Sequence, residues 1–138
     1  MRVEAQSADS IDADVVVVPV AEGGQAPPGA GDGVDERVRE LISSGEAGTE
    51  FASIAVVHEN GRRLAVAGLG KLADADAVRT GVANAARETR RIGGTLAYVV
   101  NPALDIDAAE QARAAADGLV FATYDTRKWR SGEITGKK

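Results

Sequence analysis

The amino-acid sequence predicts an α/β domain, a three-layer α/β/α arrangement around a mixed sheet of about five or six strands. Residues 14–20, DVVVVPV, are a run of β-branched side chains too uniform for a half-exposed strand, so we expect a central strand buried on both faces. Apolar runs at 53–59 and 62–68 flank Asn60 and Gly61, which is the strongest short-range signal of a β-hairpin. Three segments of helical periodicity alternate with these strands, as α/β folds require.

The first half of the chain contributes two strands and a helix to this prediction. Val3 and Ala5 indicate a short first strand, and Pro19 is expected to close the central strand because proline cannot donate to the ladder. Residues 22–33 are rich in glycine and proline and predict a loop. The next helix covers residues 34–42, and its apolar positions fall at helical spacing. They are Val34, Val38, Leu41 and Ile42.

After the hairpin, Asp74 or Asp76 can cap a helix that runs to about Arg91. One face of this helix is apolar, and the glycine pair at 93–94 is expected to end it. The residues on that face are Val78, Val82, Ala85, Thr89 and Ile92.

The last predicted elements are a strand at 95–101, which ends before a proline, and an alanine-rich helix. Asp107 followed three residues later by Glu110 resembles a capping box and marks the start of that helix. We expect the helix to run to about Tyr124, because no periodic pattern continues beyond Asp125.

Composition restricts the possible functions. A chain of 138 residues fits a single domain, and a hydrophobic fraction of 44% predicts that it folds. The absence of cysteine excludes disulfides, thiolate nucleophiles and cysteine-bound zinc. No apolar run reaches the roughly 20 residues of a membrane span, and no secretory signal is visible, so a cytoplasmic protein is the expectation. The net charge of −5 makes nucleic acid an unlikely partner.

Gly68, Gly70 and Ala73 follow an apolar strand in the pattern G-x-G-x-x-A, which is typical of dinucleotide sites. Two features argue against that function. Asp74 and Asp76 would place negative charge where the helix start should receive a phosphate. The strand before the glycines is also the second arm of a hairpin rather than the first strand of a βαβ unit. We therefore interpret the glycines as backbone-shaping residues.

Other candidate residues are isolated. His58 is the only histidine and cannot form a histidine cage for a metal, so an exposed or backbone-bonded residue at a strand end is expected. Asp9, Asp12 and Asp14 do not have the spacing of an EF-hand and favour turn and capping roles over a metal site. Trp129 is expected in a basic tail after the last helix. The residues themselves predict no catalytic, cofactor-binding or metal-binding site.

Four stretches carry a family resemblance: DADVVVVPVAEGG, LISSGEAGTE, RRLAVAGLGK and DGLVFATYDTRKWRSG. Their order and spacing resemble the N-terminal domain of the cytosol (leucyl) aminopeptidase family. The resemblance implies a macro-domain-like fold at residues 1–126, with residues 127–138 as a tail or the start of a linker to a catalytic domain.

The resemblance further implies a function in assembly and in shaping active-site access, with no catalytic activity in this chain. Members of the family remove N-terminal residues from peptides by metal-activated water. Their two divalent metal ions, zinc or manganese, are expected in the catalytic domain, and the implied partners are that domain and a homo-hexamer.

A second resemblance leaves an alternative open. DSIDADVVVVPVAEGG followed by GAGDGVDERV is similar to the strand and glycine-rich loop of macro domains, which bind ADP-ribose. Where macro domains carry an asparagine-rich loop, this chain has residues 19–22, and Glu22 would bring negative charge near a pyrophosphate. A free-standing module that binds ADP-ribose or a related nucleotide is therefore the alternative function.

Overall fold

The sheet of this domain is mixed and open. The computed structural model describes residues 13–23, 33–59, 61–91 and 95–135. The strands are β1 (Val15–Ala21), β2 (Ile54–Glu59), β3 (Arg62–Gly70) and β4 (Leu96–Tyr98), and the helices are α1 (Val34–Ser44), α2 (Ala75–Glu88) and α3 (Ala108–Thr135). The strand order is β2-β3-β1-β4, with β1 parallel to both of its neighbours and β2 antiparallel to β3.

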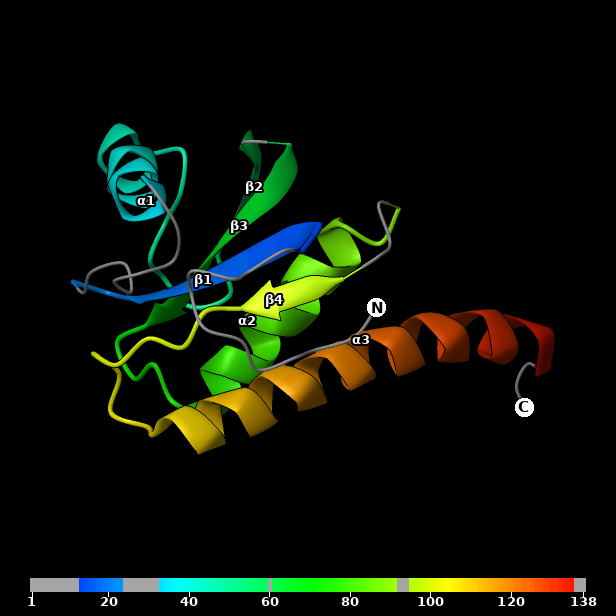
Figure 1. Cartoon of the computed structure of the whole chain (residues 1–138). Coiled ribbons are helices and arrows are strands. Elements are labelled where there is room, and N and C mark those ends of the chain that lie inside the picture. Colours follow the sequence, from blue (N-terminus) through cyan, green and yellow to red (C-terminus); the bar gives the residue numbers. More distant parts are fainter. Residues whose placement is uncertain (1–12, 24–32, 60, 92–94, 136–138) are drawn as a thin grey trace.

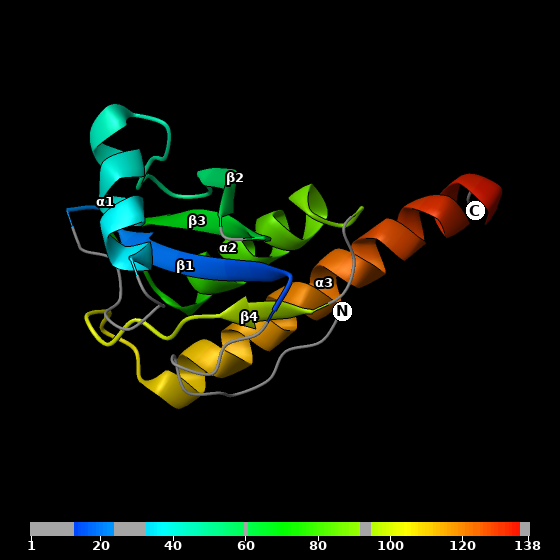
Figure 2. The ribbon, with the colours of Figure 1, turned by 45° about the horizontal axis from the view of Figure 1, so that its top comes forward.

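Helices cover both faces of this sheet. One hydrophobic core lies between the sheet and α1, and a second lies between the sheet and the pair α2 and α3. Figure 1 and Figure 2 show α1 on one side and the two longer helices on the other. The predicted three-layer α/β/α class is confirmed. The sheet has four strands in the described residues, fewer than expected, and the strand predicted at 3–5 lies outside them.

β1 is the central strand that its valine run predicts. Val15 and Val17 point into the core with α2 and α3, whereas Val16 and Val18 point into the core with α1. All four are at most 1% exposed. Because successive side chains of a strand alternate between the two faces, a strand buried on both sides needs an unbroken apolar run.

Pro19 does not close β1, contrary to the prediction, since the strand continues to Ala21. Val15 N–H donates to Thr95 and Val17 C=O accepts from Val99, so the odd-numbered residues of β1 face β4. The missing N–H of Pro19 therefore faces the β4 side, and the Pro19 carbonyl on that side accepts the Asn101 side-chain amide at 2.9 Å. The same proline explains why β4 stops at Tyr98 and not at Asn101 as predicted, because the ladder lacks its next donor.

The hairpin prediction is confirmed. In the antiparallel β2–β3 pair, Glu59 is opposite Arg62, and Gly61 in the turn has φ +81°. A two-residue turn of this kind needs positive φ, which glycine adopts without steric cost.

α1 and α2 begin where the pattern predicts. Val34, Val38 and Leu41 of α1 are buried, and Gly45 ends this helix with φ +85°. α2 ends at Glu88, three residues earlier than expected. Thr89 follows as its C-cap, and both its backbone N–H and its hydroxyl, the latter at 2.8 Å, donate to the Ala85 carbonyl. The predicted buried face of α2 is confirmed as far as it is described; Ile92 and the glycines 93–94 lie outside the described residues. The confirmed positions are Val78, Val82, Ala85 and Thr89.

α3 is longer than predicted. Asp107 caps its start, since Oδ1 accepts from the Glu110 N–H at 2.7 Å, but the helix continues past Tyr124 to Thr135. Trp129 therefore lies within a helix and not in an unstructured tail. The segment after residue 124 contains arginine, lysine and glutamate and no proline, so the helix continues on intrinsic propensity after its apolar stripe has ended. The last turns of α3 extend beyond the sheet in both views (Figure 1, Figure 2).

Candidate functional site

The glycine stretch that resembles a nucleotide fingerprint is part of β3 itself. Gly68 N–H donates to the Ser53 carbonyl at 2.8 Å, and Gly70 N–H donates to the Thr49 carbonyl at 2.9 Å. Both donors that would cradle a phosphate are thus engaged by the preceding loop. The interpretation of these glycines as structural agrees with this geometry.

Close backbone packing explains why glycine occupies both positions. A Cβ on Gly68 would lie 2.4 Å from the Glu50 carbonyl oxygen, well inside van der Waals contact. Gly70 has φ +76°, and a Cβ there would approach the Phe51 Cβ to 3.0 Å. The loop at residues 48–51 therefore occupies the space beside β3, where a side chain would otherwise stand.

α2, the helix that follows β3, has a carboxylate of the chain itself at its N-terminus. β3 continues two residues beyond the predicted run at 62–68, the chain turns after Gly70, and Ala73 adopts φ +45°. Asp74 is the residue that caps α2, and its Oδ1 accepts the Ala77 N–H at 2.9 Å. A carboxylate at this position satisfies the helix N-terminus and opposes the binding of a phosphate there.

The carboxyl ends of β1 and β4 meet a buried polar network. Asn101 Nδ2 donates to the Pro19 carbonyl at 2.9 Å, and Asn101 Oδ1 accepts the Ala103 N–H at 3.0 Å. The Gln111 side chain from α3 bonds both backbone groups of Asn101 and accepts the Tyr98 hydroxyl at 2.8 Å. Asn101 and Gln111 are at most 1% exposed. Burial raises the pKa of the Tyr98 hydroxyl well above its usual range.

This network is the feature that sequence reasoning missed, although a signal was present. Gln111 lies on the same helical stripe as the buried alanine, glycine and leucine residues of α3, which recur at intervals of three and four. These are Ala114, Ala115, Gly118, Leu119 and Ala122. A glutamine within such a stripe must be hydrogen-bonded in the core, because an unpaired buried amide is costly.

A hollow of about 420 Å³ adjoins the network, in the loop between β4 and α3. Gln111 at its floor has its amide nitrogen bonded to the Asn101 and Ile106 carbonyls, and Asp107 at its rim caps α3. The Gln111 amide thus holds the loop itself, and the Asp107 carboxylate holds the start of α3. Its lining residues are Val100, Pro102, Leu104, Asp105, Ile106, Asp107, Ala108 and Gln111.

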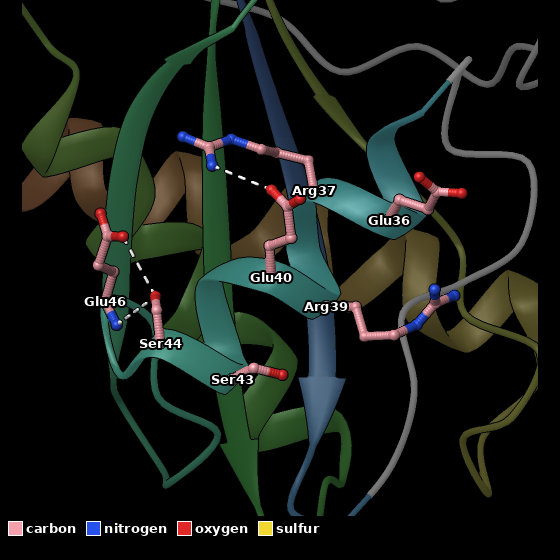
Figure 3. A pocket seen from close by; sticks show the side chains of 7 residues that line it. All are labelled: Glu36, Arg37, Arg39, Glu40, Ser43, Ser44 and Glu46. Carbon is pink, nitrogen blue, oxygen red and sulfur yellow. Dashed lines mark hydrogen bonds and ion pairs between the residues drawn. The ribbon is translucent and has the colours of Figure 1, made fainter.

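A wider depression of about 630 Å³ lies along the exposed side of α1 (Figure 3). Arg37 points toward Glu40 with a 3.4 Å contact, Ser44 Oγ bonds Glu46 at 3.1 Å, and Arg39 points away from them. Three carboxylates and two guanidinium groups mix in it, so no single sign of ligand charge is favoured. The lining residues are Glu36, Arg37, Arg39, Glu40, Ser43, Ser44 and Glu46.

The remaining sequence candidates do not converge. His58 is exposed on β2 opposite Arg63, and Asp14 accepts the Thr95 N–H at 3.0 Å, a structural bond between two chain segments. Asp9 and Asp12 lie outside the described residues. Within the described ranges, no group of three or more His, Cys, Asp or Glu side chains could hold a metal ion. None of the helices in that part of the chain combines the length and apolar character needed to cross a membrane.

These observations define an α/β domain whose conspicuous glycines, buried amides and helix caps all serve its own backbone. The sequence matches the model of the cytosol aminopeptidase family, N-terminal domain, over residues 17–133. The chain therefore belongs to this family as its N-terminal domain. A search of curated proteins gives no match to the chain.

Proposed function

We propose that this domain is non-catalytic and serves an aminopeptidase by supporting its assembly and by shaping access to its active sites. The family match over residues 17–133 carries this proposal. The active sites would belong to a catalytic domain that removes N-terminal residues from peptides, with two divalent ions, zinc or manganese, activating water there.

The chemistry of the described residues supports a non-catalytic function. Gly68 and Gly70 direct their N–H groups to loop carbonyls, and Asp74 occupies the start of α2. The buried Gln111 amide is bonded through both its oxygen and its nitrogen. Groups that are already hydrogen-bonded within the fold make the domain rigid. They are not placed to transfer a proton or to attack a substrate.

We further propose that residues 1–126 form the domain and that residues 127–138 begin a linker toward the catalytic domain. The whole enzyme would be a cytoplasmic homo-oligomer. α3 runs through residues 126 and 127 without a break, so the linker would begin as a helix that continues the domain. A rigid connection of this kind would hold the two domains at a defined distance.

Leucine amide hydrolysis by the purified chain tests the absence of catalysis. With zinc or manganese added, we expect no turnover above the metal-only blank. Hydrolysis at enzyme-like rates, retained after repeated purification, would contradict the proposal. The assembly function is tested by light scattering on the parent enzyme with and without residues 1–126, where we expect a smaller oligomer after deletion.

The alternative is a macro-like module that binds ADP-ribose or a related nucleotide. One observation favours it: β1 and β3 are parallel neighbours whose following helices, α1 and α2, lie on opposite faces of the sheet. Ligands of open α/β sheets bind at the carboxyl ends of such strands. At that edge, Glu22 N–H donates to the Gly70 carbonyl and the Glu22 side chain is exposed, which disfavours a pyrophosphate. A saturable calorimetric titration with ADP-ribose would establish the alternative, and a flat titration at millimolar ligand would exclude it.

A further inference from the structure

The outer edge of β2 presents its backbone groups in a defined pattern. Gly68 N–H bonds the Ser53 carbonyl, so in the β2–β3 register residues 55, 57 and 59 also face β3. The N–H and C=O groups of Ile54, Val56 and His58 consequently point away from the sheet. Across the described residues, no strand pairs with this side of β2 (Figure 1).

Residues 54–57 of β2 lack, in their own sequence and register, the features by which single-chain proteins protect an edge strand. Residues 54–57 are all apolar, with no proline, no charge and no bulge in their register with β3. Ile54 and Val56 pack partly on the core with α2 and α3, and Ala55 and Val57 pack partly on the core with α1. Each remains partly exposed, whereas the valines of β1 are at most 1% exposed. Both cores of the domain thus open at β2.

We propose that β2 pairs in antiparallel fashion with β2 of a second copy of this chain, in a register centred on Val56. The two sheets would then join into one, and both cores would be continuous across the junction. This inference rests on the assembly function proposed above and specifies the surface that performs it.

β2 of a second copy fits this edge because it is itself an edge strand that is apolar and partly exposed on both faces. A two-fold axis perpendicular to the sheet keeps each face on the same side, so only residues of the same face can stand opposite each other. The outward residues Ile54, Val56 and His58 are spaced symmetrically about Val56. With the axis at Val56, the two Val56 residues lie opposite each other and form a hydrogen-bonded pair. Ile54 then lies opposite His58 of the second copy.

The apolar side chains on the α1 side of β2 fit this register. Ala55 comes to lie opposite Val57 of the second copy, which extends the apolar surface on the α1 side.

Single-cysteine variants test the pairing directly, because the natural chain contains no cysteine. In a hydrogen-bonded antiparallel pair the Cα atoms are about 5.5 Å apart, a distance that a disulfide can bridge. Dilute Val56→Cys treated with diamide, a thiol oxidant, should form a covalent dimer on a non-reducing gel. Ile54→Cys should remain monomeric, because its two copies would lie roughly 14 Å apart. An equimolar mixture of Ile54→Cys and His58→Cys should cross-link.

Val120→Cys is the matched control, since Val120 is an apolar residue, 67% exposed, on α3, and α3 packs against α2. Cross-linking of Val56→Cys at the same rate as Ile54→Cys or Val120→Cys would overturn the proposal. So would a mixture of the Ile54 and His58 variants that cross-links no faster than either variant alone.

Val56→Pro distinguishes pairing at the β2 edge from assembly through another surface. Its lost N–H points outward, so the bonds of β2 to β3 remain, and circular dichroism should show a folded chain. Light scattering should show that the dimer is reduced to a monomer. If the chain assembles and Val56→Pro leaves the assembly unchanged, the β2 junction is wrong while an assembly function stands. If the chain is monomeric at every concentration tested, the junction is wrong regardless of the hydrolysis assay.

Discussion

Gln111 holds both backbone polar groups of Asn101: its Nε2 donates to the Asn101 carbonyl at 2.9 Å and its Oε1 accepts the Asn101 N–H at 3.0 Å. A side chain from α3 thereby takes the place of a neighbouring strand at the point where β4 has ended. Buried backbone groups must be paired, and here one amide pairs two of them without water.

Replacing Gln111 by leucine should destabilise the domain strongly. The substitution leaves the Asn101 N–H and the Tyr98 hydroxyl without their buried acceptor, so we expect a loss of about 2–4 kcal/mol in the free energy of unfolding. Urea denaturation followed by circular dichroism measures it. Arg113→Gln, at an exposed position two residues away, should change the free energy by less than about 0.5 kcal/mol. Equal stability of the two variants would contradict the network.

Stability should depend on the ionisation of Tyr98 at alkaline pH. Burial raises the pKa of this hydroxyl in the folded state, while the unfolded state keeps a pKa of about 10. Above pH 10 the unfolded state releases its proton first, so the free energy of unfolding falls as pH rises, by up to about 1.4 kcal/mol per pH unit. Below pH 10 the contribution is fully present.

Tyr98→Phe isolates that dependence. At pH 7 the variant should lose about 1 kcal/mol with its hydrogen bond to Gln111. Between pH 10 and 11 the wild type should lose stability relative to the variant, so the gap between the two curves narrows. Parallel curves across this range, measured by thermal unfolding, would show that Tyr98 does not titrate with folding.

Gly68→Ala should lower the free energy of unfolding more than Gly45→Ala, because Gly45 has open space around it. Its Cβ would meet the Glu50 carbonyl, and we expect a loss of about 3 kcal/mol as β3 and the preceding loop separate. Gly45 has φ +85° and nothing within 4 Å of a new Cβ, so Gly45→Ala should cost only about 1 kcal/mol of backbone strain. The denaturant concentrations at the midpoints of unfolding of the two variants measure this difference. A lower midpoint for Gly45→Ala than for Gly68→Ala would contradict the close packing of Gly68 against the loop.

Asp74→Ala should remove the cap of α2 at a cost of about 1 kcal/mol. The matched variant is Asp76→Ala, which removes a carboxylate from the same turn but only an exposed ion pair with Arg79. We expect less than about 0.5 kcal/mol from it, because surface ion pairs contribute little. A larger loss from the Asp76 variant would identify Asp76, rather than Asp74, as the capping residue.

Local chemistry explains which elements could be predicted. The valine run of β1 predicts a strand that is buried on both faces. Gly61 predicts the hairpin turn, because few other residues adopt the positive φ that this turn needs. The start of α2 follows from Asp74, whose side chain acts within its own turn. The end of α3 was predicted too early, because its last turns have no apolar periodicity and rely on helix propensity.

The sequence by itself determined the α/β class, the hairpin, the helix starts and the family, because each depends on periodicity, on turn residues or on motif order along the chain. Only the tertiary structure decided how Pro19 is tolerated in the central strand, why Gly68 cannot carry a side chain, and which partner the buried Gln111 bonds. The physical reason is that these three depend on atoms distant in sequence: the Asn101 amide, the Glu50 carbonyl and the Asn101 backbone. Periodicity identifies which face of an element is buried, whereas a hydrogen bond or a steric contact across the sheet becomes visible only when both partners are in place.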